Sequence, residues 1–327
     1  MIENLIPMNP TRRDFLRSTA FATAALAAPQ ILRAQATSPF KVSVITDEIS
    51  DDFDHACSIA ANEFGMRWVE LRTLWKTTVT ELKQDDLARA QAILAKYHLG
   101  VSDIASPLFK VDFPGAPIGA SSLKRGATAE SVTATYRHQD QVLESAIEMA
   151  KAFKCNHVRC FDFWRIADPS PFRKEIDGKL SSAAEHARDK GIILVLENEQ
   201  ECNTATAREA IRTLDAVPAI SLNWDPGNAV MSGELDAFPK GFELLPKGRI
   251  HHCHVKNAVK DASGKMVWAP VDIGYVDWAK QFAALKAMGY KEAVSLETHW
   301  RGGGTPEEST RKSWEGMKKA LAAAGAL

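Results

Sequence analysis

The strongest constraint on the fold is a pattern that recurs along the chain: an amphipathic helix, a turn, and then a short β-prone run that ends in polar residues. Short runs of β-branched and aromatic residues bounded by turn signals are typical of buried strands. Eight such runs are expected to form strands, at residues 42–48, 68–72, 101–106, 157–162, 192–197, 220–225, 250–256 and 293–297.

The segments between these strands have the pattern of helices. Residues 86–98, 139–153 and 278–288 carry apolar side chains at i, i+3 and i+4 spacing. Each of four glycines that precede a strand is expected to be the left-handed residue that ends the preceding helix: Gly65, Gly100, Gly191 and Gly289. The strands recur about every 36 residues, which is the length of one βα unit. Eight such units predict an α/β fold, a single-domain (β/α)8 TIM barrel over residues 37–327.

A doubly wound open sheet is the alternative architecture. The barrel is favoured because no glycine-rich phosphate loop follows the first expected strand, residues 42–48. The longest stretch without a clear pattern, residues 111–135, is rich in Pro and Gly and follows the third expected strand. It is expected to be a lid or a substrate-binding loop, with a plain insertion as the alternative.

Residues 1–36 are expected to be a twin-arginine signal peptide. The sequence TRRDFLR at residues 11–17 precedes an uncharged, alanine-rich apolar stretch and then Ala34-Gln35-Ala36. This stretch is shorter than the roughly 20 residues of a membrane span. We expect the twin-arginine export machinery to recognise the chain and cleavage to follow Ala36, which predicts a periplasmic or otherwise exported protein. An ordinary amphipathic first helix is the alternative.

Composition excludes several classes of partner. The net charge is −1, and residues 1–36 hold four arginines against Glu3 and Asp14, so about −3 remains in the mature chain. Such a chain offers no basic surface to nucleic acid. The five cysteines are scattered without CxxC spacing and are expected to be buried small hydrophobes. The sequence leaves a homo-oligomer open.

Four residues that carry chemistry end the last four expected strands: Glu197, Asp225, His254 and Glu297. The carboxyl ends of barrel strands meet at one mouth. A lone buried Glu or His is commonly a hydrogen-bonded core residue, but three carboxylates in one concave mouth would be very unfavourable without a cation. The sequence therefore predicts a divalent metal ion held by these four residues. Three oxygen donors and one nitrogen suit Mn2+, with Mg2+, Co2+ and Zn2+ as alternatives.

Neighbouring positions on the same strands supply further candidates. Side chains two residues before the ligands face the same interior, and there Asn223, His252 and Ser295 are expected to hydrogen-bond the ligands from beneath. Ordinary polar core groups are the alternative. Two residues beyond the ligands, Lys256 and His299 are expected to line the pocket rim and contact a polyol substrate, with solvated loop residues as the alternative.

Several phrases of the sequence resemble one known superfamily. They are LEN at 196–198, NWDPGNA at 223–229, HCHVK at 252–256, and VDW followed by GYKEAVSLE within 276–297. They resemble the xylose isomerase-like TIM-barrel superfamily of sugar isomerases and epimerases over nearly the whole mature chain. The resemblance implies that Glu197, Asp225, His254 and Glu297 bind Mn2+ or a similar ion. It also implies that Glu197 and Glu297 are catalytic and exchange protons on opposite sides of an enediolate.

The sequence also departs from the ketose 3-epimerases of that superfamily. Where those enzymes carry a substrate-binding Glu and His, this chain has Asn203 and Asn228, which we expect to bind the substrate in a different way. Arg72 and Arg159 end two earlier strands and could bind hydroxyls, a carboxylate or a phosphate. Their alternative role is pairing with Glu70 or Glu48 at the barrel mouth. Four aromatic residues just past strand ends could stack on a sugar: Trp75, Phe109, Trp164 and Trp300.

Three functions remain open from the sequence. The leading hypothesis is a metal-dependent isomerase or epimerase acting on an unphosphorylated sugar or cyclitol. A lyase or dehydratase acting on a keto-sugar or keto-glycoside would use the same metal and enolate. A non-catalytic carbohydrate-binding protein with a structural metal would keep the fold without proton transfer. A hydrolase of the endonuclease type needs more metal ligands and a basic DNA-binding face, and the sequence has neither.

Overall fold

Eight parallel strands form the centre of the molecule. The structure is a computed structural model and describes residues 38–327, so the expected export motif and the cleavage site after Ala36 lie outside the described residues. Each strand of the sheet falls within two residues of where the sequence predicts it to begin. The strands are β1 Lys41–Val44, β2 Trp68–Leu71, β5 Gly100–Leu108, β6 His157–Cys160, β7 Ile193–Glu197, β8 Ser221–Trp224, β9 Ile250–Val255 and β12 Ala293–Leu296.

The sheet is curved into a nearly closed barrel. The strand order is β1-β12-β9-β8-β7-β6-β5-β2, and neighbouring strands in it pair in parallel. A parallel bridge between Ile45 and Glu70 joins the two ends. The predicted TIM barrel is therefore confirmed, and the doubly wound open sheet is excluded, because an open sheet would leave its two edge strands apart.

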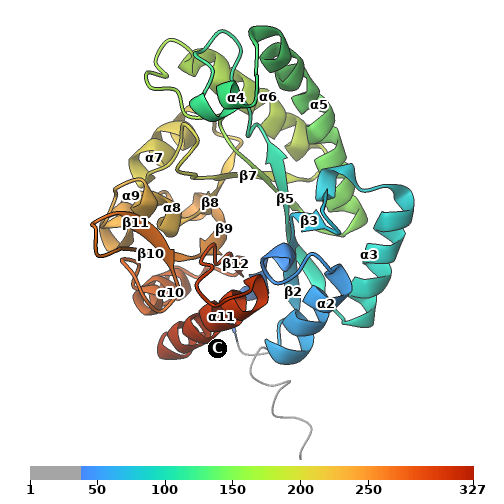
Figure 1. Ribbon diagram of the computed structural model, residues 1–327, viewed down its shortest axis with the longest axis vertical. Helices are drawn as coiled ribbons and strands as arrows, with labels where there is room; N and C mark the ends of the chain where they lie inside the picture. The colour runs from blue at the N-terminus through green and yellow to red at the C-terminus, as the bar shows by residue number, and fades with distance from the viewer. Residues whose placement is uncertain (1–37) are drawn as a thin grey trace, which may run out of the picture.

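Helices surround the sheet (Figure 1). The longer ones are α3 Gln84–Lys96, α5 Ala129–Ala152, α6 Arg173–Asp189, α7 Ala207–Ala216, α10 Trp278–Ala287 and α11 Pro306–Ala323. Shorter helices are α2 Phe53–Ser58, α4 Ala120–Lys124, α8 Pro226–Met231 and α9 Phe242–Leu244, and single turns lie at Thr46–Glu48, Ile59–Glu63, Val79–Glu81, Ala237–Gly241 and Lys247–Arg249. Two hairpins lie beyond strand ends, β3 Thr73–Leu74 with β4 Thr77–Thr78, and β10 Asn257–Lys260 with β11 Met266–Ala269.

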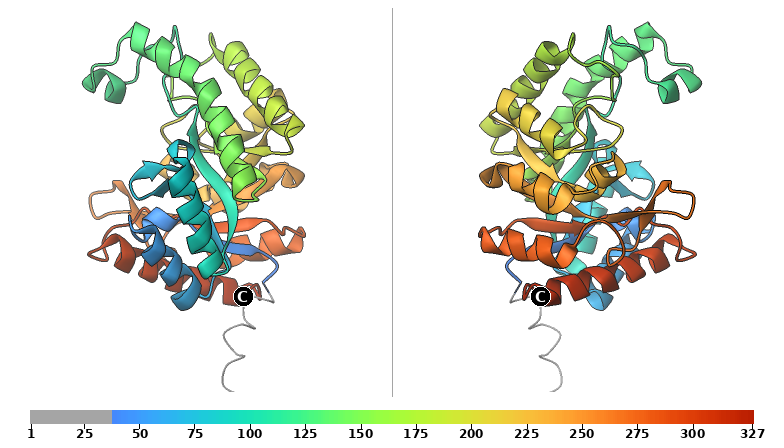
Figure 2. Two further views of the ribbon diagram at one scale, coloured as in Figure 1. Left: turned by 90° about the vertical axis from the view of Figure 1, so that its right-hand side faces the viewer. Right: turned by 90° about the vertical axis from the view of Figure 1, so that its left-hand side faces the viewer.

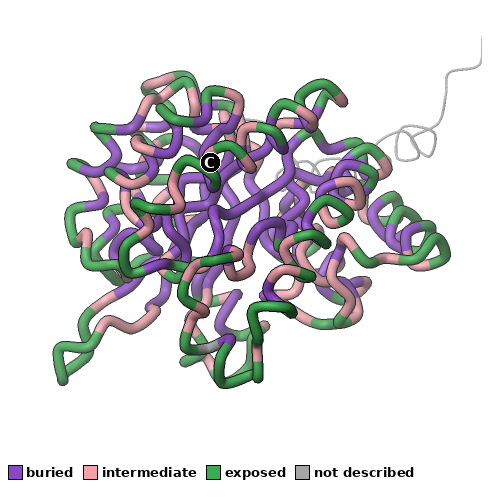
Figure 3. The backbone as a smooth tube through the Cα atoms, turned by 90° about the horizontal axis from the view of Figure 1, so that it is seen from above, coloured by how far each residue is buried: buried purple, intermediate pink, exposed green. Residues whose placement is uncertain are grey.

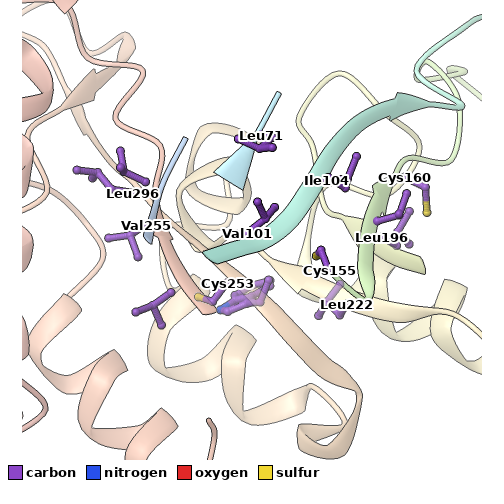
Figure 4. Packing of buried hydrophobic residues seen from close by; sticks show 14 of the residues in the cluster. Leu71, Val101, Ile104, Cys155, Cys160, Leu196, Leu222, Cys253, Val255 and Leu296 are labelled. Carbon is purple, nitrogen blue, oxygen red and sulfur yellow. The ribbon is translucent and has the colours of Figure 1, made fainter. Parts of the chain in front are cut away.

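Alternation along the strands separates an apolar layer from a polar interior. Leu196, Leu222 and Cys253 belong to the apolar cluster between strands and helices, and Figure 4 shows them among its packed side chains. Glu197, Asn223 and His254, each one residue further on, are equally buried but belong to the other face of the strands. Buried residues fill the middle of the molecule and exposed ones its periphery (Figure 3). All five cysteines are free and buried, as expected.

Three of the four predicted helix-ending glycines have the expected conformation. The φ angles of Gly65, Gly191 and Gly289 are 70°, 79° and 78°. The prediction is wrong for Gly100, because His98 takes the left-handed position after α3, with a φ of 54°. Gly100 is needed for another reason: a Cβ there would lie 2.6 Å from the ring of Trp68.

The expected lid segment, residues 111–135, is partly helical. It contains α4, which projects from the body in Figure 2, and the first turns of α5. The start of α5 was missed because residues 129–138 are mostly polar; a capping box formed by Thr128 and Ser131 begins the helix instead. Residues of the segment, among them Arg125, line a pocket of about 380 Å3 together with Lys110 and Trp164. Among residues 38–327, none of the helices has the length and hydropathy needed to cross a membrane.

Candidate metal centre

The four expected metal ligands come together at the carboxyl ends of neighbouring strands. Glu197 ends β7, Asp225 follows β8, His254 lies near the end of β9, and Glu297 follows β12. One ligand atom from each lies within 4.8 Å of the others, and no residue of the four is more than 2% exposed. His254 Nδ1 is 3.3 Å from Glu197 Oε1, 3.6 Å from Asp225 Oδ2 and 3.0 Å from Glu297 Oε2. We call these three oxygens the inner oxygens.

The other oxygen of each carboxylate is held from outside the cluster. Arg159 donates to Glu197 Oε2 at 3.0 Å, and Arg72 donates to Glu297 Oε1 at 2.7 Å. Asp225 Oδ1 accepts from the backbone N–H of Asn228 at 2.8 Å, because Asp225 is the N-cap of α8. These contacts fix the carboxylates so that their inner oxygens meet His254 Nδ1.

Both arginines that could bind substrate contact carboxylates of the protein in this structure. The Arg159 side chain is only 7% exposed and also donates to the carbonyl groups of Ala105 and Ser106. Arg72 is 24% exposed and also donates to Asp47 and Glu48. Of the two pairings that the sequence left open for it, the one with Glu48 is therefore found and the one with Glu70 is not. Buried arginines in such contacts orient carboxylates, because the guanidinium fork fixes their planes.

Lys256 lies inside the cluster, and its predicted place at the rim is therefore wrong. Its side chain is completely buried, and Nζ is 2.6 Å from Glu297 Oε2, 2.8 Å from Asp225 Oδ2 and 3.7 Å from Glu197 Oε1. Burial alone would lower the pKa of Lys256, but these carboxylates outweigh it and hold that pKa well above its ordinary value. The sequence could not reveal this position because the path of the side chain depends on the neighbouring β8–α8 turn.

The two glutamates are strongly favoured in their ionised forms. Burial alone would raise both pKa values, but the charges of His254 and Arg159 outweigh it and lower the pKa of Glu197. The charges of Lys256, His299 and His254 do the same for Glu297, whose pKa lies well below its ordinary value. Both carboxylates are therefore unprotonated at neutral pH, which is the form that a general base needs.

A polar layer lies beneath the ligands, and its central residue is Glu70. Both Glu70 oxygens are 3.0 Å from an imidazole nitrogen, Oε1 from His254 Nε2 and Oε2 from His252 Nε2. Since a carboxylate only accepts, His254 donates through Nε2, and Nδ1 is the nitrogen directed at the inner oxygens. In the sequence, Glu70 stands out only weakly, as a polar residue near a strand end.

The three residues predicted to support the ligands behave differently. Asn223 Nδ2 lies 3.1 Å from His254 Nε2, so its position beneath the ligand is as expected, but an NH2 group cannot donate to a nitrogen that itself donates to Glu70. The prediction is wrong for His252, which contacts Glu70 rather than a ligand, and for Ser295, whose hydroxyl has no hydrogen-bond partner among residues 38–327. In the same described part of the chain, both oxygens of the fully buried Asp103 also lack a partner, and burial raises the pKa of Asp103 to about 7.

The two asparagines that replace epimerase residues support the protein itself. Asn228 donates to Glu197 Oε1 at 3.0 Å and to Asp225 Oδ2 at 3.2 Å. Asn203 donates to the backbone carbonyl of Asp162 and accepts from the backbone N–H of Ile166, which braces the loop after β6. The predicted contact of Asn203 with the substrate stays a prediction, and in this structure its amide group already has these backbone partners. Asn228 touches the ligands directly.

His299 is the predicted substrate contact that stays at the mouth. Its side chain is 31% exposed, and Nδ1 is 3.8 Å from Glu297 Oε1. The ring of Trp268, on the β10–β11 hairpin, lies 5.2 Å from the His299 ring and 5.3 Å from Lys256 Nζ. Trp268 could not be recognised from the sequence, because this hairpin is an addition to the βα repeat. Of the expected stacking residues, Phe109 is completely buried and packs against Phe163.

The residues present fit a divalent metal ion. The inner oxygens and His254 Nδ1 give three oxygen donors and one nitrogen donor, a set suited to Mn2+ or Mg2+. Glu70 supports the imidazole from behind, as carboxylates commonly do in metal sites. The fold and this cluster define the class of the protein: a TIM barrel with a buried group of side chains that resembles a divalent metal site.

Comparison with known proteins identifies the family. The model of the family named "Xylose isomerase-like TIM barrel" matches residues 59–320, and the chain therefore belongs to this family. No curated protein sequence matches the chain. Solved structures similar to this protein include a sugar epimerase, an epimerase-like protein and a probable dehydratase.

Three solved structures illustrate the likeness, which at these identities concerns the fold alone. A Mycobacterium smegmatis xylose isomerase-like TIM barrel protein in complex with magnesium has a TM-score of 0.61 and 16% identity, covering 89% of this chain and 99% of that one. D-allulose 3-epimerase from Methylomonas sp. in complex with D-allulose has 0.62 and 18%, covering 88% and 98%. The probable 3-DHS dehydratase AsbF from Bacillus anthracis has 0.60 and 20%, covering 85% and 98%.

Proposed function

We propose that this protein is a metal-dependent isomerase or epimerase that moves a proton on a carbon next to the carbonyl group of a sugar or cyclitol. One observation carries the proposal: two ionised glutamates, Glu197 and Glu297, reach one point from β7 and β12, and each is fixed by its own arginine. A pair of positioned carboxylates can remove a proton from one face of a carbon and return it to the other.

The chain's own residues then have separable tasks. One glutamate accepts the proton as a carboxylate, and the opposite glutamate must carry a proton of its own when it supplies one to the other face, while Arg72 and Arg159 keep both side chains in place. A divalent ion held by Glu197, Asp225, His254 and Glu297 would supply positive charge where the substrate oxygen becomes negative. His299 and Trp268, at the mouth, are placed to contact the hydroxyl groups and the apolar face of a sugar ring.

The proposal includes the place of action. The twin-arginine pattern at residues 11–17 supports export, and an exported enzyme would meet unphosphorylated carbohydrates. We therefore propose an unphosphorylated sugar or cyclitol as the substrate. We propose Mn2+ as the ion because the site offers three oxygen donors and one nitrogen donor.

A lyase or dehydratase reaction is the second candidate, and Asn203 and Asn228 favour it. They replace the residues that hold sugar hydroxyls in the ketose 3-epimerases, and their amides contact this protein's own backbone and ligands instead. A site that binds hydroxyls in a different way can allow the same deprotonated intermediate to expel a leaving group.

Deuterium exchange tests both candidates in one experiment. The Mn2+-loaded protein is incubated in D2O with a panel of unphosphorylated ketoses, cyclitols and keto-glycosides, and NMR detects deuterium at carbon. Exchange with an isomeric product is expected. Exchange with elimination products would support the lyase, and a silent panel would favour a binding protein instead.

Matched glutamine variants locate the chemistry. E197Q and E297Q are each expected to lower the exchange rate at least about 100-fold, because one proton-transfer group is lost. E199Q is the control: Glu199 lies two residues beyond Glu197 and pairs with Lys110 instead of the ligands. Equal loss of exchange in E199Q would contradict the assigned roles.

A further inference from the structure

Lys256 contacts the same atoms that a metal ion needs. Its Nζ is 2.6 Å from Glu297 Oε2 and 2.8 Å from Asp225 Oδ2, two of the three inner oxygens. The third, Glu197 Oε1, is 3.7 Å away. A cation coordinated by these oxygens would lie about 2.0–2.6 Å from each of them, too close to an ammonium group in the position that Nζ has here. The two cations therefore compete for one place.

The path of the Lys256 side chain is built into the fold. A Cβ on Gly227 would lie 2.7 Å from Lys256 Cγ, so only glycine leaves room for the side chain beside the start of α8. The indole N–H of Trp278 donates to the Lys256 carbonyl at 3.0 Å and fixes the backbone. The Trp268 ring, 5.3 Å from Nζ, offers the ammonium another partner on the mouth side.

The charges explain why an ammonium group is useful here. Arg72 and Arg159 each neutralise the outer oxygen of one glutamate, but no arginine contact to Asp225 is found among residues 38–327. Three buried carboxylates repel one another unless positive charge lies among them. Lys256 supplies such a charge from the chain itself, and its ammonium group contacts Asp225, which neither arginine contacts.

We propose that Lys256 is a built-in counter-ion of the metal centre, and that a divalent ion binds by displacing its ammonium group from the inner oxygens. The residue thereby keeps the ligands assembled before the ion arrives and weakens the affinity for the ion. This inference concerns metal loading and does not depend on the sugar chemistry proposed above, so the two can fail separately.

Measuring the Mn2+ affinity of the purified full chain tests whether the ion displaces the Lys256 ammonium group. Mn2+ binding is measured by competition with a fluorescent chelator for the wild type and for K256M, which keeps an unbranched side chain one atom shorter and removes its charge. K256M is expected to bind Mn2+ at least about tenfold more tightly, and its Mn2+-free form to melt at a lower temperature than the Mn2+-free wild type. K110M is the matched control: Lys110 Nζ is 2.9 Å from Glu199 Oε2, outside the ligand set, and Mn2+ affinity should not change.

Two results would overturn the proposal. Equal or weaker Mn2+ binding by K256M would mean that the ammonium group does not compete with the ion. If neither the wild type nor K256M binds Mn2+, no ion displaces the ammonium group and the proposal is refuted. If K256M does not fold, crystals of the wild type grown with EDTA and with Mn2+ decide. Loss of both Nζ contacts in the Mn2+ crystals supports the exchange, whereas Nζ still within hydrogen-bond distance of Asp225 and Glu297 beside a bound ion refutes it.

Discussion

Replacing Glu70 with glutamine tests how the barrel interior holds the metal-binding imidazole. Glu70 is completely buried, and its two oxygens accept from His254 and His252 at 3.0 Å each. A glutamine keeps the shape but presents an NH2 group to one of these N–H donors. One charge-assisted hydrogen bond is lost and one buried donor is left without an acceptor.

The magnitude follows from those two contacts. A hydrogen bond to a charged group contributes about 1.5–3 kcal/mol, and an unsatisfied buried polar group costs about 1–3 kcal/mol. Because the two costs overlap, we expect E70Q to lower the free energy of unfolding by about 2–4 kcal/mol. Removing a carboxylate behind a metal-bound imidazole typically weakens metal affinity about 10–100-fold, and the same loss is expected for Mn2+.

The assay combines urea unfolding with chelator competition for Mn2+. The control is E234Q: Glu234 accepts a single hydrogen bond from the backbone N–H of Ala207 and lies outside the ligand cluster. That variant is expected to lose some stability without a change in Mn2+ affinity. An E70Q protein with wild-type Mn2+ affinity would refute the claim that Glu70 orients His254.

Three further predictions concern separate parts of the chain. Burial raises the pKa of Asp103 from 3.8 to about 7. The stability that its protonated form contributes is therefore present below pH 4 and is lost as pH rises towards 7. In urea unfolding, D103N should be more stable than the wild type at pH 8, by about 1–4 kcal/mol, and no more stable at pH 4. G100A should be destabilised by about 1–3 kcal/mol because its Cβ would meet the Trp68 ring at 2.6 Å, and an unchanged urea midpoint would contradict that clash. Replacing Arg12 and Arg13 together with lysine should leave the unprocessed protein in the cytoplasm, which cell fractionation and mass spectrometry would detect.

The fold could be predicted because it repeats. Each strand carries enough β-branched and apolar residues to be recognised alone, and eight of them at similar spacing allow few arrangements other than a barrel. The ends of the strands can be recognised in the sequence as well. Glu197, Asp225, His254 and Glu297 could therefore be placed at one mouth of the barrel from the sequence alone. Barrel closure, rather than any long-range signal in the sequence, brings these four residues together.

What the sequence could not predict depends on side-chain paths and on additions to the repeat. Lys256 was expected at the rim, but the space beside Gly227 lets its side chain reach the inner oxygens. Asn203 could not be recognised as a loop brace, because its partners lie about 40 residues away in the loop after β6. Trp268 belongs to a hairpin that the eight-strand pattern does not contain.

Anomalous diffraction at the manganese edge, from crystals of the wild type grown with Mn2+, tests the central claim most directly. The account predicts one strong peak bounded by Glu197 Oε1, Asp225 Oδ2, Glu297 Oε2 and His254 Nδ1. Manganese bound elsewhere, or no peak within coordination distance of these four atoms, would contradict it.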